Sequence, residues 1–503
     1  MKASAGVVCE KSRVPVSCRI QYLLNAAQAI TPVSTQTTFS TAPRDPDAPM
    51  TPLERRGMTA MLLAVALATL DTAIANTALP AIAADLHATP AASVWIINAY
   101  QLSMVATLLP LAALGGIIGH RRVYLSGLIL FTVASAICAF SWSLPTLVAA
   151  RLLQGVGAAA IMSVNTALIS AIFPIHRLGR GLGLNALIVG VSFAVGPTVA
   201  SIVLSLGTWP WLFAVNLPVG VLALLIGWPA LPKTPKSPHD FDRVAAALNV
   251  VTFAALIFAL GEAAQRAPTH VVLAALAVTA VAGGLMLHRE RGHPAPMLPV
   301  DLFRRPMFAL STMTAICSFA AQGLAFVSLP FYFEGVLGRS QVETGFLMTP
   351  WSVLVALMAP IAGRLSDRYA PGLLGGVGLA ILCAGMVSLA MLPANPHVLD
   401  IGIRMSICGA GFGFFQSPNL KALMASAPRE RSGGASGVVA TARLLGQALG
   451  AALVALSFGI AGKHGPALAL SLGAGFAGAA SIASGLRLVT RDPGAAPMRA
   501  AEE

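Results

Sequence analysis

A succession of apolar segments, each long enough to cross a lipid bilayer, constrains this chain more than any other feature. A transmembrane helix needs about 20 consecutive, mostly apolar residues. Only 10% of the 503 residues are charged, against about 25% in an average soluble domain. This excludes a cytosolic globular enzyme, a disordered chain and a disulfide scaffold. The sequence predicts an all-α membrane protein with fourteen transmembrane helices, at about residues 57–79, 93–116, 122–142, 145–170, 181–206, 211–231, 244–263, 269–288, 308–332, 343–363, 372–392, 398–422, 434–460 and 466–486.

The basic residues between these segments are distributed unevenly. The termini and the loops after even-numbered segments carry most of the 32 lysines and arginines, whereas the other side has only Arg266, Arg339 and Lys463. Because basic residues accumulate on the cytoplasmic side of membrane proteins, we expect a multi-pass protein of the bacterial cytoplasmic (inner) membrane with both termini in the cytoplasm. The net charge of +13 is then a topology signal, and no nucleic-acid partner is expected.

Matching residues recur between the two parts of the chain at a nearly constant separation. Arg151 and Arg404 form one such pair, and Gly196 and Gly450 form another. The pattern predicts two pseudo-symmetric six-helix halves with two helices inserted between them. Met50 heads the stretch before the first span, and one hypothesis is that translation starts there. The expected division is a disordered cytoplasmic segment at 1–56, a first half at 57–231, a linker with two extra helices at 232–307, a second half at 308–490 and a cytoplasmic tail at 491–503.

Four motifs in the first half point to one family. They are Leu70 to Pro80 in the first span, Arg151 to Gly157 in the fourth, Gly190 with Gly196-Pro197 in the fifth, and Trp209 to Phe213 with Asn216-Leu217-Pro218 at the sixth. From about residue 57 to 490 the chain resembles the fourteen-span drug:proton antiporter family of the major facilitator superfamily. The resemblance implies two halves that alternate access to a central site.

The function implied by this resemblance is proton-coupled export of small amphipathic or cationic compounds. It needs no cofactor, because the proton gradient drives transport. Export of one endogenous metabolite or siderophore is the alternative, and a non-transporting membrane sensor is a further one. The chain has no phosphate-binding loop and no protease or hydrolase motif, so we expect no enzyme and no catalytic residue. The expected partners are small-molecule substrates, protons and the bilayer; the protein is expected to be monomeric, and a periplasmic adaptor stays open.

Asp71 is the first candidate for proton coupling. A carboxylate within a span is costly and usually faces the bundle interior or a wet cavity. Counted at 1.5 Å per residue, Asp71 and Arg151 lie at similar depth, so we expect them to interact directly or through Gln154 and water. Two alternatives stay open: Asp71 as a purely structural group, and Arg151 as a cap on backbone carbonyls. The repeat counterpart of Asp71 is Ala321, and Arg404, without an acid on the ninth span, is expected to be structural.

Two glycine-containing motifs are candidates for conformational change. In the fifth span, the resemblance makes Gly190, Gly196 and Pro197 an antiport hinge, although ordinary packing of small residues would explain them too. In the loop after the tenth span, it makes Gly363, Arg364, Asp367 and Arg368 a cytoplasmic gating loop. The first-half copy of this loop has Gly116 where the acid is expected. Solvated charges placed for topology are the alternative.

Polar and aromatic residues inside the spans are candidates for lining the transport cavity, although packing would explain each of them individually. The six cysteines lack metal-ligand spacing, so no metal site is expected. The candidate cavity residues are Asn76, Tyr100, Gln101, Gln154, Gln322, Trp351, Gln416 and Asn419.

Overall fold

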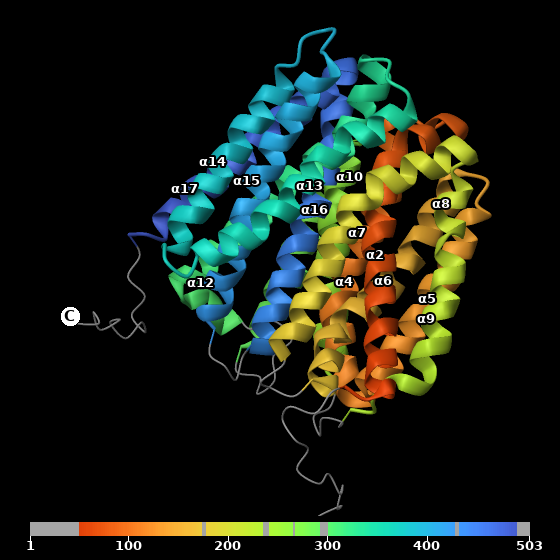
Figure 1. Cartoon of the computed structure of the whole chain (residues 1–503), viewed down its shortest axis with the longest axis vertical. Helices are drawn as coiled ribbons and strands as arrows, with labels where there is room; N and C mark the ends of the chain where they lie inside the picture. Colours follow the sequence, from red (N-terminus) through yellow and green to blue (C-terminus); the bar gives the residue numbers. More distant parts are fainter. Residues whose placement is uncertain are drawn as a thin grey trace, which may run out of the picture. The chain divides into compact units, whose positions relative to one another are not determined.

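The computed structural model describes residues 50–173, 178–234, 241–264, 267–291, 300–427 and 432–489. Over these residues the chain is almost entirely helical and contains no β-strand, which confirms the predicted all-α class (Figure 1). The expected disordered segment and C-terminal tail fall almost wholly outside the described residues.

Thirteen stretches of the described chain are long and apolar enough to span a membrane. The last of them, Gly434–Leu486, contains two helices separated by the short 3₁₀ turn Gly462–His464. The described residues therefore contain the fourteen long apolar helices that the sequence predicts as spans. They are α2 (Pro52–Asp85), α4 (Trp95–Ile118), α5 (His120–Ala139), α6 (Leu144–Ile172), α7 (Leu178–Leu206), α9 (Asn216–Ala230), α10 (Arg243–Ala264), α11 (Thr269–Glu290), α12 (Pro306–Phe331), α13 (Gln341–Leu365), α14 (Pro371–Ala390), α15 (Val398–Ala425), α16 (Ser432–Ala461) and α17 (Gly465–Leu486).

Helix α2 begins earlier than its apolar run. Thr51 and Glu54 form a capping box, in which the Thr51 hydroxyl accepts from the Glu54 amide at 3.2 Å and the Glu54 carboxylate accepts from the Thr51 amide at 2.8 Å. This pairing satisfies backbone donors that a helix start otherwise leaves free. The helix therefore starts at Pro52 rather than at the expected Gly57. Short helices α3 (Pro90–Ser93) and α8 (Pro210–Ala214) lead directly into α4 and α9.

The first and second halves have separate cores and a shared one. Tyr124 and Phe131 belong to a cluster built mainly from α2, α4, α5 and α6, and Met386 and Phe412 belong to a cluster built from α12 to α17. A third cluster contains residues of both halves from the end of the bundle where α2 ends and α4 begins. We call this end the distal end, and the end that carries Arg121 the basic end. The shared core joins the halves at the distal end.

Helices α7 and α13 contact each other across the two halves. Thr198 and Thr349 share a hydrogen bond between their hydroxyls at 2.9 Å, and the Ser201 hydroxyl donates to the Gln341 carbonyl at 3.3 Å. Both bonds lie toward the distal end, and within the described residues no hydrogen bond joins these helices nearer the basic end. The halves are therefore hydrogen-bonded along α7 and α13 on the distal side only.

The two inserted helices pack against each other, and α10 also packs against α4 and α16. The Asn249 amide of α10 donates to the Ala106 carbonyl of α4 at 2.7 Å. Asp242 lies directly before α10 and forms an ion pair with Arg289 of α11 at 2.7 Å. The Arg289 guanidinium and two backbone amides that bond to Asp242 lower the pKa of its carboxyl group below the usual value.

Candidate functional site

Asp71 lies in α2 with only 2% of its surface exposed. The Arg151 Nη1 atom lies 2.5 Å from Asp71 Oδ2, which confirms the expected direct contact. Two neutral donors bind the other oxygen: Gln154 Nε2 donates to Oδ1 at 2.9 Å and Asn216 Nδ2 donates to it at 2.8 Å. Side chains from α6 and α9 thus bind both oxygens of the carboxylate of α2.

Arg151 fulfils both roles that the sequence left open. Besides Asp71, it donates from Nε to the Ile96 carbonyl at 3.2 Å and from Nη1 to Gln154 Oε1 at 2.6 Å. Its guanidinium carbon lies 4.1 Å from the ring centre of Tyr100, within the range of a cation–π contact. The arginine therefore pairs with the acid and also caps a backbone carbonyl of α4.

Gln154 extends this cluster to α5. Its Nε2 atom donates to the Ser135 hydroxyl at 2.8 Å as well as to Asp71. The Ser135 hydroxyl in turn donates to the Phe131 carbonyl at 2.8 Å. Both amide protons of Gln154 are therefore used. Asn216 Oδ1 is the one atom named in this cluster that is enclosed without a partner among the described residues. The remaining hydrogen bonds hold Asp71 of α2 against α6 and α9 and connect it through Gln154 to α5.

Sequence reasoning missed two members of this cluster. In the sequence Asn216 stands out only as part of a motif at the sixth span, and nothing marks Ser135 as a candidate. Asn216 begins α9 and is 1% exposed. Its signal was a polar residue at the start of an otherwise apolar run, although no periodicity tells which neighbour such a residue meets. The second-half arginine, Arg404, differs from Arg151: it pairs with Asp400 of its own helix at 2.9 Å and donates to the Ser388 carbonyl.

The glycines of the fifth span have different surroundings. A Cβ atom on Gly196 would lie 2.3 Å from the Cβ of Ala73, so this glycine permits close contact between α7 and α2 near Asp71. The carbonyl of Pro197 would lie 2.5 Å from a Cβ on Gly345 of α13. No atom lies within 4 Å of such a Cβ on Gly190. Tight packing therefore explains Gly196 but not Gly190.

The loop residues after α13 form contacts within the second half. Asp367 Oδ1 lies 2.6 Å from Lys421 Nζ of α15, and Lys421 also donates to the Ser366 carbonyl at 2.8 Å. Arg364 and Arg368 are exposed. The ion pair joins α13 to α15, and within the described residues it does not reach the first half.

The candidate cavity residues do not form one cluster. Asn76 Oδ1, Gln101 Oε1 and Trp351 Nε1 are enclosed without a hydrogen-bond partner. Gln322 accepts from Gln447 at 3.2 Å. Asn419 donates to the Ser311 carbonyl at 3.2 Å and accepts from Arg487 at 2.7 Å. Tyr100 is buried and donates to the Ala68 carbonyl at 3.2 Å, while Gln416 is half-buried.

The described residues form fourteen long apolar helices in two halves, with a buried carboxylate–guanidinium pair inside the first half, and this arrangement is typical of a membrane transporter. Within the described residues no cluster of side chains could hold a metal ion. The chain belongs to the Major Facilitator Superfamily, whose family model matches residues 61–451.

Named relatives support the transporter class. "Uncharacterized transporter YebQ" of Escherichia coli (strain K12) is 51% identical over 430 residues, which cover 85% of this chain and 94% of that protein. "Riboflavin transporter RibZ" of Clostridioides difficile (strain 630) is 30% identical, covering 79% and 86%. "Multidrug resistance protein Stp" of Mycobacterium tuberculosis (strain CDC 1551 / Oshkosh) is 31% identical, covering 76% and 72%.

A solved structure supports the fold. The crystal structure of a bacterial homologue of the human lysosomal transporter Spinster, in an inward-facing and unoccupied conformation, aligns with a TM-score of 0.63. The alignment covers 87% of this chain and 98% of that chain at 14% sequence identity.

Proposed function

We propose that this protein is a proton-coupled antiporter that exports small amphipathic or cationic compounds across the bacterial cytoplasmic membrane. Both termini lie in the cytoplasm, and the monomer is the transporting unit. The observation that carries the proposal is Asp71: an almost completely buried carboxylate, in the middle of a span, bound by three donors. The relative named as a multidrug resistance protein supports the cargo class.

The proton acts through the contacts of Asp71. When this carboxylate is ionised, its contacts with Arg151, Gln154 and Asn216 hold α2 against α6 and α9. Protonation removes the charge that balances Arg151 and turns one acceptor oxygen into a donor. With the proton on Oδ2, that oxygen no longer receives the Arg151 donor, whereas Oδ1 still accepts from Gln154 and Asn216, so the contact of α2 with α6 weakens.

The change reaches the interface between the halves through α7. Ala73 follows Asp71 in α2 and packs against Gly196 of α7, and α7 is hydrogen-bonded to α13 of the other half. Loosening α2 therefore changes the packing of α7, which contacts both α2 and α13. Rocking of the two halves about a site near the membrane midplane supplies alternating access.

The test is Asp71→Asn in proteoliposomes that contain the pH-sensitive dye pyranine. A panel of small amphipathic compounds is added under a controlled pH gradient, and proton movement and compound uptake are recorded together. Asp85→Asn is the matched control, because Asp85 lies on the same helix and accepts from the Trp209 indole, a bond that an amide oxygen also accepts. We expect Asp71→Asn to lose compound-driven proton movement and the control to keep it. Unchanged coupling in Asp71→Asn would refute the proposal.

A second candidate, export of one endogenous metabolite, is favoured by the similarity to a relative named as a riboflavin transporter. Overexpression would then leave drug susceptibility unchanged and alter the set of metabolites found outside the cell. A shift in resistance to several unrelated compounds would reject this candidate.

A further inference from the structure

A cation in the middle of the second half lacks a carboxylate partner. Arg443 lies in α16, about 16 Å along the helix from Ser432 at 1.5 Å per residue. Its side chain is half-buried, its Nε atom is enclosed without a hydrogen-bond partner, and no ion pair between described residues includes it. An arginine at such depth faces the bundle interior or a water-filled cavity and normally pairs with an anion.

The helix that carries Arg443 packs against the first half beside the coupling site. Helix α16 contacts α4, and Leu444, next to Arg443, belongs to the same core as Tyr100 of α4. The Tyr100 ring lies against Arg151. The helix with the unpaired cation therefore packs against the helix whose Tyr100 contacts the buried ion pair.

Asp71 does not neutralise Arg443 in this conformation. Arg151 occupies one of its oxygens, and Gln154 and Asn216 occupy the other. The charges of Asp71 and Arg151 cancel, so the three groups together leave one positive charge at the centre of the bundle. A positive charge in a weakly polar medium attracts anions and repels cations strongly.

Resting on the antiport function proposed above, we propose that Arg443 binds an anionic group of the transported compound. A guanidinium matches a carboxylate, sulfonate or phosphate with two parallel hydrogen bonds. Of the amphipathic and cationic compounds proposed above as cargo, the site then binds amphipathic compounds that carry an acidic group, and it disfavours compounds with a permanent positive charge.

The test measures equilibrium binding of three dansyl probes to the purified protein by fluorescence. Dansylglycine carries a carboxylate, dansylglycinamide is its uncharged analogue, and dansyl-ethylenediamine carries an ammonium group. We expect the carboxylate to bind most tightly. Arg443→Gln weakens its binding about tenfold or more, the typical effect of losing a charge-assisted hydrogen bond, and leaves the amide unchanged. Arg443→Lys keeps part of the preference, and Lys463→Gln, at the exposed turn after α16, keeps all of it.

The proposal would be overturned if the wild-type protein bound dansylglycine and dansylglycinamide equally well. It would also be overturned if the ratio of these two affinities were the same in Arg443→Gln and Arg443→Lys as in the wild type. An Arg443 variant that alters proton coupling but keeps the preference for the carboxylate probe would also overturn the proposal. Such a result would mean that Arg443 pairs with Asp71 in another conformation. Binding does not require proton coupling, so failure here is distinct from failure of the antiport function.

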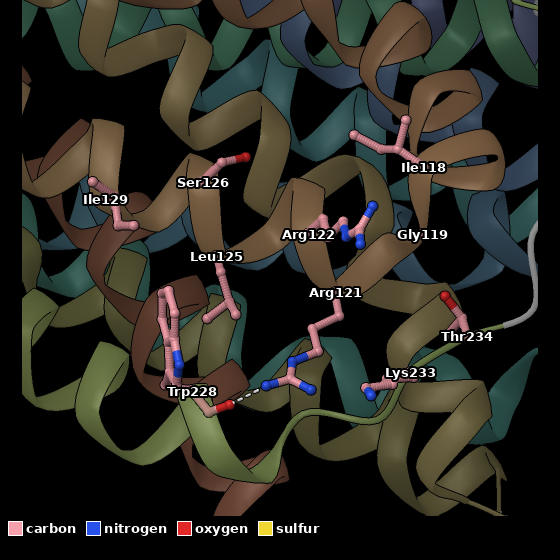
Figure 2. A pocket seen from close by; sticks show the side chains of 10 residues that line it. All are labelled: Ile118, Gly119, Arg121, Arg122, Leu125, Ser126, Ile129, Trp228, Lys233 and Thr234. Atoms are coloured by element: carbon pink, nitrogen blue, oxygen red, sulfur yellow. Dashed lines mark hydrogen bonds between the residues drawn. The ribbon is translucent and has the colours of Figure 1, made fainter.

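An independent observation concerns a cavity of about 540 Å³ at the basic end, between the end of α4, the start of α5 and the segment after α9 (Figure 2). Its lining includes Arg121, Arg122 and Lys233 and no acidic residue. Arg121 reaches toward α9 and donates to the carbonyl of Trp228. At the N-terminus of α5, the positive end of the helix dipole, the His120 amide donates to the hydroxyl of Thr234, which also lines the cavity, at 3.0 Å.

The wall of this cavity continues onto the apolar outer surface of the bundle. Ile129 of α5 is 41% exposed and Trp228 of α9 is 58% exposed, and both line the cavity. Basic groups at the helix ends, above an exposed apolar wall, fit a molecule with an anionic head and a hydrocarbon tail. We infer that this cavity binds the phosphodiester headgroup of an anionic phospholipid.

The test is thermal unfolding in detergent with added phosphatidylglycerol, phosphatidylcholine or inorganic phosphate. We expect phosphatidylglycerol alone to raise the Tm, and Arg122→Gln with Lys233→Gln to abolish the rise. Arg55→Gln with Arg56→Gln, two exposed arginines at the start of α2, is the matched control and keeps it. An equal rise with phosphatidylcholine or phosphate, no rise in the wild type, or an unchanged rise in the double variant would each overturn the inference.

Discussion

Removing Arg151 tests how strongly the buried ion pair holds the first half together. Arg151→Met leaves Asp71 buried, with Gln154 and Asn216 still donating to Oδ1 but without the donor that the structure gives to Oδ2. Breaking one partner of a buried pair costs about 3–5 kcal/mol, because the remaining charge is uncompensated. Adding Asp71→Asn removes that charge. We therefore expect the double variant to be about 2–3 kcal/mol more stable than the sum of the two single costs predicts.

The free energy of unfolding of the four proteins is measured by circular dichroism in mixed micelles with increasing dodecyl sulfate. The control cycle uses Asp367→Asn and Lys421→Met, an ion pair of nearly equal length, 2.6 Å against 2.5 Å, with side chains 73% and 46% exposed rather than 1% each. For this surface pair the coupling energy should stay below about 1 kcal/mol. Additive costs for Asp71 and Arg151, to within about 0.5 kcal/mol, would show that burial does not strengthen their contact and would refute the reasoning.

The helix contacts and the loop pair give further expectations. Gly196→Ala should reduce both the Tm and transport, because its new Cβ meets Ala73 at 2.3 Å, and Ala73→Gly should restore the Tm; a Gly196→Ala protein as stable as the wild type would contradict this. Gly190→Ala, with open space around it, should gain about 0.5–1 kcal/mol of stability, and a loss would indicate a contact that the structure does not have. Because the pKa of Asp242 is lowered in the folded protein, its contact with Arg289 stabilises the fold above the unfolded pKa of about 4 and is lost as the pH falls through the lowered value. Wild type and Asp242→Asn should then differ in Tm at pH 7 and converge in strong acid, and a difference that grows on acidification would reverse the sign.

The sequence predicts the parts of this site that depend on one-dimensional spacing. Apolar runs place the spans, and the constant rise of a helix is enough to bring Asp71 and Arg151 to the same depth. The start of α2 was missed although its signal was present, because the Thr51–Glu54 capping box lies outside the apolar run. The contact of Asn216 with Asp71 was not predictable, since it depends on how α9 is rotated about its axis. The same holds for Gly190, which has no neighbouring atom within 4 Å of a Cβ placed on it although Gly196 on the same helix is tightly packed.

The two arginines related by the internal repeat explain why the halves differ chemically despite their common origin. Arg151 keeps a fully buried position because Asp71, on another helix, supplies its counter-charge. At the position equivalent to Asp71 the second half has Ala321, so a guanidinium at the same depth there would be uncompensated, at a cost of several kcal/mol. Arg404 instead pairs with Asp400 on its own helix and stays partly exposed, near the helix start. Arg404 and Arg151 lie at nearly the same distance from the start of their helices, so the source of the counter-charge, a second helix for Arg151 and its own helix for Arg404, accounts for the difference in their burial.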